Sequence, residues 1–246
     1  MTRSDDRRAA AVVEGLATGA VGAGLAWVAL SPLERLADGS AAVGAAAAGL
    51  NGMISGAAGA YAWRRVRGWL CFVVDSTWGL LGVSSGLLLH AVNVIYRNPS
   101  YVVGMSRRAN RHVYESGFSV RPGFALALGN VVSGAGGSAG LRGDSPGAVR
   151  RRKLVDVHEG VHLFQNRLLG PLYPLLYLGW MVVAGAAGLM VSLLGDRKNR
   201  WAVMETFAYY DNPFEYWAYR NDDYWPPHGA HPRYVWGARR ARRMDR

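Results

Sequence analysis

The residues most able to do chemistry lie together in the segment His158-Glu159-Gly160-Val161-His162. The surrounding sequence, 154–169, has the apolar spacing of a helix and is followed by a Gly-Pro pair that ends one. On a helix, histidines four residues apart share one face, so His158 and His162 converge on one metal ion while Glu159 reaches a water held by that metal. The pattern predicts a Zn²⁺ site with Glu159 as the general base. The alternative is a helix with two buried or capped histidines.

A catalytic zinc needs a third protein ligand, because two imidazoles leave the site incomplete. The other histidines have no spacing tied to the motif; they are His90, His112, His228 and His231. Glu215 is the better candidate, since Asn212-Pro213 starts a new helix and places Glu215 in its first turn or two. The small Ala218 one turn later allows close helix packing. The expected ligand set is therefore His158, His162 and Glu215.

These residues resemble the gluzincin type of zincin metallopeptidases, whose active-site helix carries His-Glu-x-x-His and whose third ligand is a glutamate on a later helix. The resemblance covers 155–177 and 212–219. These two segments also resemble segments of uncharacterised bacterial membrane proteins with predicted peptidase motifs. The resemblance implies His158, His162 and Glu215 as zinc ligands, Glu159 as general base, and a protein or peptide as substrate. It also implies that 124–132 is the edge strand that pairs with that substrate.

The chain departs from related membrane peptidases at one position. Those of the prenyl-protein-processing and heat-shock-induced kinds carry an Asp where this chain has Tyr219. Tyr219 cannot make the contact that this Asp makes in those peptidases, and Asp222 and Asp156 are the candidates to replace it.

Two apolar segments near the N-terminus, 15–30 and 41–63, contain no charged residue. Each is at or near the length of about 20 residues that a helix needs to cross a bilayer. The pairs Gly15/Gly19 and Gly52/Gly56 have the spacing that lets two membrane helices approach closely. We therefore expect a membrane-spanning helical hairpin, rather than an Ala/Gly-rich linker or a cleavable signal peptide.

Two further apolar segments are 69–96, with Asp75 as its single acid, and 172–195, with no charge. We expect both to be interrupted near the middle: the first between Gly79 and Gly86, a span that contains Ser84-Ser85, and the second at Gly185 and Gly188. A full crossing by 172–195 would separate His162 from Glu215, because 201–214 is too short and polar to return. We therefore expect this segment to fold back around its two glycines, or to tilt so that the site lies at membrane depth on a single side.

The region between these segments is typical of a soluble domain: 113–120 and 124–132 predict short strands, and 134–146 predicts a flexible loop. The expected fold class is mainly α, with integral-membrane helices and a small zincin-like α+β portion whose strands precede the motif helix. The expected organisation is 1–96, membrane helices, with two spans and an apolar re-entrant or spanning segment; 97–153, basic strands and loops; 154–225, motif helix, apolar hairpin and Glu-bearing helix; and 226–246, basic tail.

Composition supports a membrane location. Half of the 246 residues are apolar and only 18% are charged. The net charge is +11, and almost all of the basic residues are arginines. A disordered chain or a disulfide-rich module is excluded, the latter because Cys71 is the one cysteine. We expect membrane lipid as a partner and no nucleic acid, since no groove-reading module is present.

The sequence thus predicts an integral-membrane, zinc-dependent metallopeptidase. We expect it in a bacterial plasma membrane, with its site on the cytoplasmic side or at the membrane interface, because the arginine-rich loops carry the cytoplasmic signature. Two alternatives stay open: a non-catalytic membrane scaffold or pseudo-peptidase, and a zinc hydrolase of a non-peptide substrate.

Overall fold

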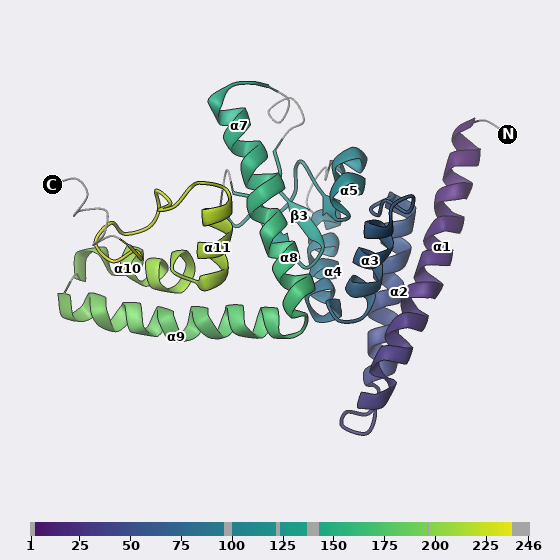
Figure 1. Ribbon diagram of the computed structural model, residues 1–246, viewed down its shortest axis with the longest axis horizontal. Coiled ribbons are helices and arrows are strands. Elements are labelled where there is room, and N and C mark those ends of the chain that lie inside the picture. The colour runs from purple at the N-terminus through teal and green to yellow at the C-terminus, as the bar shows by residue number, and fades with distance from the viewer. Residues whose placement is uncertain (1–2, 96–99, 122–123, 137–142, 196, 238–246) are drawn as a thin grey trace. The chain divides into compact units, whose positions relative to one another are not determined.

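The computed structural model describes residues 3–95, 100–121, 124–136, 143–195 and 197–237. The chain divides into two compact units, Met1–Pro171 and Leu172–Arg246, which are described separately. Most described residues are helical, and three short strands precede the helix of the His-Glu motif (Figure 1). The expected mainly helical fold with a small sheet is confirmed.

The first unit begins with two antiparallel helices, α1 (Arg3–Leu30) and α2 (Ser40–Ala58), joined through the short 3-10 helix η1 (Ser31–Leu33) (Figure 1). They pack closely because glycines bring the backbones together: a Cβ on Gly52 would collide with the carbonyl oxygen of Thr18. Thr18 Oγ1 also donates to the Gly52 carbonyl oxygen at 2.7 Å. The predicted hairpin, with its close approach at glycines, is confirmed.

The third apolar segment forms two helices, α3 (Val66–Ser76) and α4 (Leu80–Ile95), that meet at a 90° bend. The break lies between Ser76 and Leu80, where the Gly79 amide donates to the Val74 carbonyl oxygen at 2.7 Å. The interruption expected between Gly79 and Gly86 thus lies at the N-terminal limit of that span and not at Ser84-Ser85. Both serines lie inside α4, and each hydroxyl donates to a carbonyl of the preceding turn, which the helix accommodates.

A short helix α5 (Val103–Ala109) leads into a three-stranded sheet of order β1-β3-β2. The strands are β1 (His112–Val113), β2 (Leu126–Leu128) and β3 (Val131–Ser133); β1 pairs parallel and β2 antiparallel with β3. The expected single strand over 124–132 is wrong, because Gly129, with φ of 54°, turns the chain between β2 and β3. Of these two strands, β2 lies at an edge of the sheet and β3 is its central strand. The strand expected over 113–120 is limited to β1.

The motif helix is continuous with the helix before it. Ser145 caps α7 (Pro146–Lys153) by accepting from the Ala148 amide, and α7 runs through a π-helical turn, η2 (Leu154–His158), into α8 (Glu159–Leu169). Of the loop expected over 134–146, residues 137–142 lie outside the described residues, and Pro146 already belongs to α7.

The second unit is built on one long helix, α9 (Leu172–Gly195), so the expected reversal at its glycines is wrong. The chain returns instead through the short 3-10 helix η3 (Arg197–Asn199), α10 (Arg200–Glu205) and the π-helical turn η4 (Thr206–Tyr210), which pack along α9. Gly188 permits this packing, because a Cβ there would lie 2.9 Å from Phe207 Cβ. The two glycines are thus sites of close helix packing. The last helix is α11 (Pro213–Asn221).

Three helices among the described residues are long and apolar enough to cross a membrane: Asp5–Leu33, Ser40–Ala58 and Leu172–Gly195. The bent pair of α3 and α4 makes a fourth candidate if it is counted as one span.

The glycine contact between α1 and α2 predicts opposite effects for two alanine substitutions. Gly52→Ala should lower the free energy of unfolding by about 1–3 kcal/mol, because the methyl group meets rigid backbone. Gly24→Ala should raise it by about 0.5–1 kcal/mol, because that Cβ would have no neighbour within 4 Å and alanine favours the helix. Denaturant unfolding in detergent measures both. Equal effects of the two substitutions would contradict the packing.

Candidate metal centre

Two imidazole nitrogens lie close together on the motif helix. His158 Nε2 and His162 Nε2 are 3.3 Å apart, and both side chains are buried. Two nitrogens bound to one tetrahedral metal ion at about 2.0–2.1 Å are themselves about 3.3–3.4 Å apart. The separation also fits an N–H···N hydrogen bond. The helix thus presents the two predicted histidines as a pair that can share either a metal ion or a proton.

A third residue of the same helix fixes the orientation of His162. Gln165 is fully buried, and its Oε1 lies 3.0 Å from His162 Nδ1. Since an amide oxygen only accepts, Nδ1 carries the proton and Nε2 of the neutral ring keeps its lone pair for a ligand. Sequence reasoning missed Gln165, although its position one turn after His162 places it on the same helix face.

Glu159, the predicted general base, is buried within the first unit beside two arginines. Arg111 and Arg151 both interact electrostatically with its carboxylate. Burial lowers the pKa of Arg111, while Asp156 and then Glu159 act to raise it. A buried carboxylate therefore has cationic neighbours that compensate for its removal from water.

Arg111 also stabilises the π-helical turn that precedes the motif. Its Nη2 donates to the Val155 carbonyl oxygen at 2.7 Å and forms an ion pair with Asp156 at 3.3 Å. Turns of this kind interrupt the regular backbone bonding of a helix and often occur at functional sites. Asp156, one of the two candidates to replace the Asp that Tyr219 displaces, is thus an ion-pair partner of Arg111.

Glu215 belongs to the second unit, where it lies in the first turn of α11, as predicted. Asn212 caps this helix by accepting from the Phe214 amide at 3.1 Å, and Pro213 occupies its first position. Glu215 is buried, and its Oε1 accepts from the Tyr177 hydroxyl of α9 at 2.7 Å. The return of the chain along α9 therefore brings Glu215 back to the first turns of that helix.

The remaining residues singled out by the sequence lie in the same unit. Tyr219, at the position of the missing Asp, is buried in an aromatic cluster with Tyr210, Ala230 and Val235. Asp222 is buried at the C-terminal end of α11. Within the first unit the structure thus brings His158, Glu159 and His162 together, while the inclusion of Glu215 in one ligand set stays a prediction.

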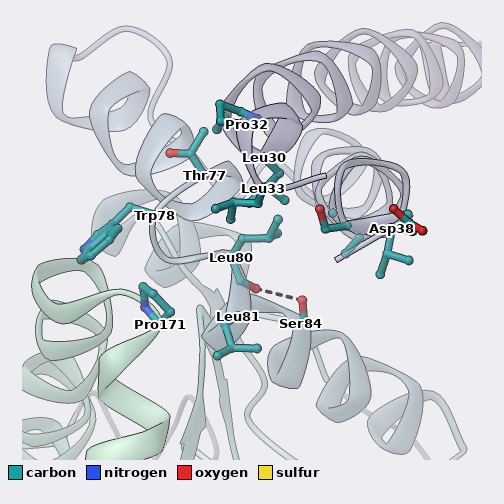
Figure 2. A pocket seen from close by; sticks show the side chains of 16 residues that line it. Leu30, Pro32, Leu33, Asp38, Thr77, Trp78, Leu80, Leu81, Ser84 and Pro171 are labelled. Atoms are coloured by element: carbon teal, nitrogen blue, oxygen red, sulfur yellow. Dashed lines mark hydrogen bonds between the residues drawn. The ribbon is translucent and has the colours of Figure 1, made fainter. Parts of the chain in front are cut away.

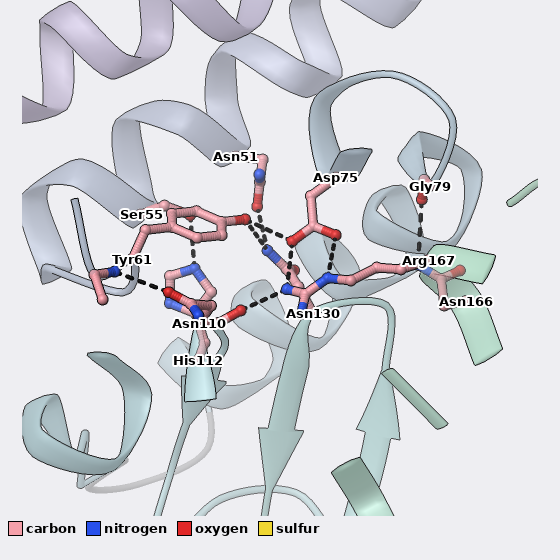
Figure 3. A network of polar contacts seen from close by, with 11 residues as sticks. Asn51, Ser55, Tyr61, Asp75, Gly79, Asn110, His112, Asn130, Asn166 and Arg167 are labelled. Carbon is pink, nitrogen blue, oxygen red and sulfur yellow. Dashed lines mark hydrogen bonds and ion pairs between the residues drawn. The ribbon is translucent and has the colours of Figure 1, made fainter. Parts of the chain in front are cut away.

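A buried ion pair fixes the motif helix within the first unit (Figure 3). Arg167 of α8 donates to both carboxylate oxygens of Asp75 in α3, at 2.9 and 2.7 Å, and Asp75 is fully buried. The Tyr61 hydroxyl donates to the same carboxylate at 2.8 Å, and Asn130 Nδ2 donates to that hydroxyl at 3.2 Å. The acid that the sequence placed in an apolar segment therefore anchors α8.

The first unit also contains a cavity of about 830 Å³ near the turn between α1 and α2 (Figure 2). Its lining is mostly apolar, and Asp38 is the one charged residue in it. Trp78, on one wall, donates its indole N–H to the Leu168 carbonyl oxygen of α8 at 3.2 Å. The cavity thus adjoins the end of the motif helix, but no residue of the His-Glu motif lines it.

Comparisons with protein-family models, curated proteins and solved structures find no match to the chain.

The buried ion pair predicts that a single substitution costs more than a double one. Asp75→Asn leaves Arg167 buried without a counter-charge and should lower the free energy of unfolding by about 3–5 kcal/mol. The double variant Asp75→Leu/Arg167→Met removes both charges and should lose less than Asp75→Asn alone. Denaturant unfolding of the wild type and the two variants measures this, and a double variant less stable than Asp75→Asn would contradict the ion pair.

Proposed function

We propose that this protein is a zinc-dependent metallopeptidase integral to a membrane, with His158, His162 and Glu215 as ligands. The observation that carries the proposal is the 3.3 Å separation of the two Nε2 atoms on the helix that also bears Glu159. That separation suits a tetrahedral ion, and the donor set of two imidazoles and a carboxylate is one that catalytic zinc uses.

The second unit supports the choice of Glu215 as third ligand. Helix α9 begins directly after Pro171, and only Gly170 and Pro171 separate it from α8. The hydrogen bond from Tyr177 holds Glu215 beside the first turns of α9, at the end of the unit that is covalently joined to the motif helix. His158, His162 and Glu215 are all buried, and each offers one ligand atom. The continuous α9 therefore remains compatible with the ligand set.

Hydrogen bonds also orient the proposed ligands. Gln165 Oε1 lies 3.0 Å from Nδ1 of His162, and the Tyr177 hydroxyl donates to Oε1 of Glu215 at 2.7 Å. Such outer contacts orient metal ligands and hold them in the ligating state. Neither Gln165 nor Tyr177 belongs to the motif, so their contacts are independent support for a metal-binding role.

The chemistry follows from these residues. A Zn²⁺ ion in such a site acts as a Lewis acid that makes water nucleophilic near neutral pH and polarises a carbonyl group. With such an ion bound, Glu159, next to His158, would act as the general base for that water and would return the proton to the leaving amine. Arg111 and Arg151 both interact electrostatically with the Glu159 carboxylate, so the proposed general base has cationic neighbours.

The membrane part of the proposal rests on the helices that are long and apolar enough to cross a bilayer. Their apolar side chains are exposed to a degree that is unusual in water: Val28 is 74% exposed, Val43 71% and Val182 72%. Lipid would cover these side chains.

Because α1 and α2 hold the protein in the bilayer through apolar contact, it should stay in the membrane fraction after a carbonate or high-salt wash. Release by salt alone would favour peripheral attachment.

Substitution of the proposed ligands tests the metal site. His158→Ala, His162→Ala and Glu215→Ala should each lose the zinc that the wild-type protein retains, because each removes one of three ligands. Glu159→Gln should keep the zinc and lose turnover of a peptide substrate, since the amide cannot accept the proton. Zinc content by mass spectrometry and hydrolysis of a peptide library measure these effects. Full activity of Glu159→Gln would exclude the general-base role.

The same experiment separates the alternatives. A wild-type protein that binds zinc but cleaves no peptide would be a scaffold with a structural metal, or a hydrolase of another substrate class. A wild-type protein without zinc would mean that the two histidines share a proton instead.

Gln165 provides a further test that does not depend on activity. Gln165→Leu should weaken zinc binding by about 10–100-fold, because His162 loses the acceptor that fixes its protonated nitrogen. Gln165→Glu keeps an acceptor and should retain most of the affinity. Competition with a zinc chelator measures both, and equal affinities of the Leu variant and the wild type would show that Gln165 has no part in the site.

A further inference from the structure

One end of the first unit carries exposed arginines that the proposed hydrolase does not use. We call this set the basic end surface; its members are Arg64, Arg65, Arg67, Arg107 and Arg108, all exposed. The first three lie in the connection from α2 to α3 and in the first turn of α3, and the other two lie at the end of α5.

Hydrogen bonds hold these two segments together. Arg107 Nε donates to the carbonyl oxygen of Gly59, just after α2, at 3.4 Å. The Ala62 amide donates to Asn110 Oδ1, just after α5, at 2.9 Å. The arginines of both segments therefore belong to one continuous surface.

Acidic side chains do not neutralise this surface. Within the described part of the chain, none of the five arginines forms a salt bridge. Glu14 of α1 reaches the same end, but its Oε1 accepts from the Trp63 indole at 2.6 Å. Five cationic groups are thus available to an external anion.

Apolar side chains border the arginines. Trp69, Leu70 and Val66 of α3 are all exposed, and the Trp69 ring packs against Trp63 with centroids 4.9 Å apart. Tryptophan and arginine beside exposed aliphatic side chains are typical of the interface between a membrane and water. This neighbourhood favours a lipid surface over a nucleic acid, whose backbone offers nothing to the aliphatic groups.

The two ends of the hairpin differ in charge. The 19 residues of α2 correspond to about 28 Å, close to the thickness of the hydrocarbon core. At the other end, the turn between α1 and α2 contains Glu34, Arg35 and Asp38, and the Glu34 carboxylate accepts from the Gly39 and Ala41 amides. Only the end with the basic end surface therefore suits an anionic lipid layer.

We propose that the basic end surface binds the phosphate headgroups of anionic phospholipids. Guanidinium groups match phosphate oxygens in geometry and charge, and the exposed apolar groups of α3 enter the adjoining acyl region. This inference rests on the membrane location in the proposed function and is independent of the zinc site.

The test uses the full chain, purified in an uncharged detergent and mixed with either phosphatidylglycerol or phosphatidylcholine. Native mass spectrometry counts the bound lipid. The wild type should prefer phosphatidylglycerol, and the preference should weaken in high salt. The triple variant Arg64→Gln/Arg65→Gln/Arg67→Gln should lose about tenfold to a hundredfold in apparent affinity for phosphatidylglycerol. The double variant Arg107→Gln/Arg108→Gln should lose affinity in the same direction.

The matched control is Arg197→Gln/Lys198→Gln/Arg200→Gln, which removes three exposed positive charges from the second unit and should keep the wild-type preference. An equal loss in the control and the triple variant would mean that net charge alone attracts the lipid, and would overturn the proposal. So would an unchanged preference in the triple variant, or binding of a single-stranded oligonucleotide in place of lipid. Zinc content, measured on the same samples, should be unchanged, which separates this inference from the metal site.

Discussion

The main constraint on the first unit is a carboxylate buried among apolar helices. Asp75 is withdrawn from water, and its charge is compensated by the two hydrogen bonds from Arg167 and one from Tyr61. Because a buried charge without a partner is very unfavourable, α8 must keep Arg167 at this position. The ion pair therefore fixes the motif helix to α3, and with it the direction in which His158 and His162 face.

The proposed metal centre combines two different kinds of local order. In the first unit, a continuous helix sets the spacing of the histidines, and Gln165 sets the protonation of His162. In the second unit, Glu215 is positioned by a capped helix and by the Tyr177 hydroxyl, after the chain has returned along α9. In the proposed site each unit would thus orient its own ligands before an ion binds, which would reduce the entropy lost in assembling the site.

The sequence was informative wherever the signal was local. The motif helix, its end at Gly170, the helix start at Asn212-Pro213 and the close-packed hairpin of α1 and α2 were all predictable from spacing, caps and small residues. Predictions that required non-local information were wrong. Gly185 and Gly188 indicated a reversal, whereas their lack of side chains serves the packing of α10 and η4.

The same distinction applies to the polar residues. Asp75 could be recognised as unusual in an apolar segment, but its partner Arg167 lies 92 residues away, and no sequence pattern joins them. Gln165 could have been predicted from the helical period, because it follows His162 by three residues and so lies on the same helix face. Tyr177 could not, because its contact with Glu215 depends on how far the chain returns along α9.

The central claim is that both units contribute to one zinc site, and X-ray absorption at the zinc edge of protein purified without added metal tests it most directly. The account predicts two imidazole nitrogens and a carboxylate oxygen at about 2.0–2.2 Å from the ion. A spectrum with one imidazole or none, or with a sulfur ligand at about 2.3 Å, would contradict it.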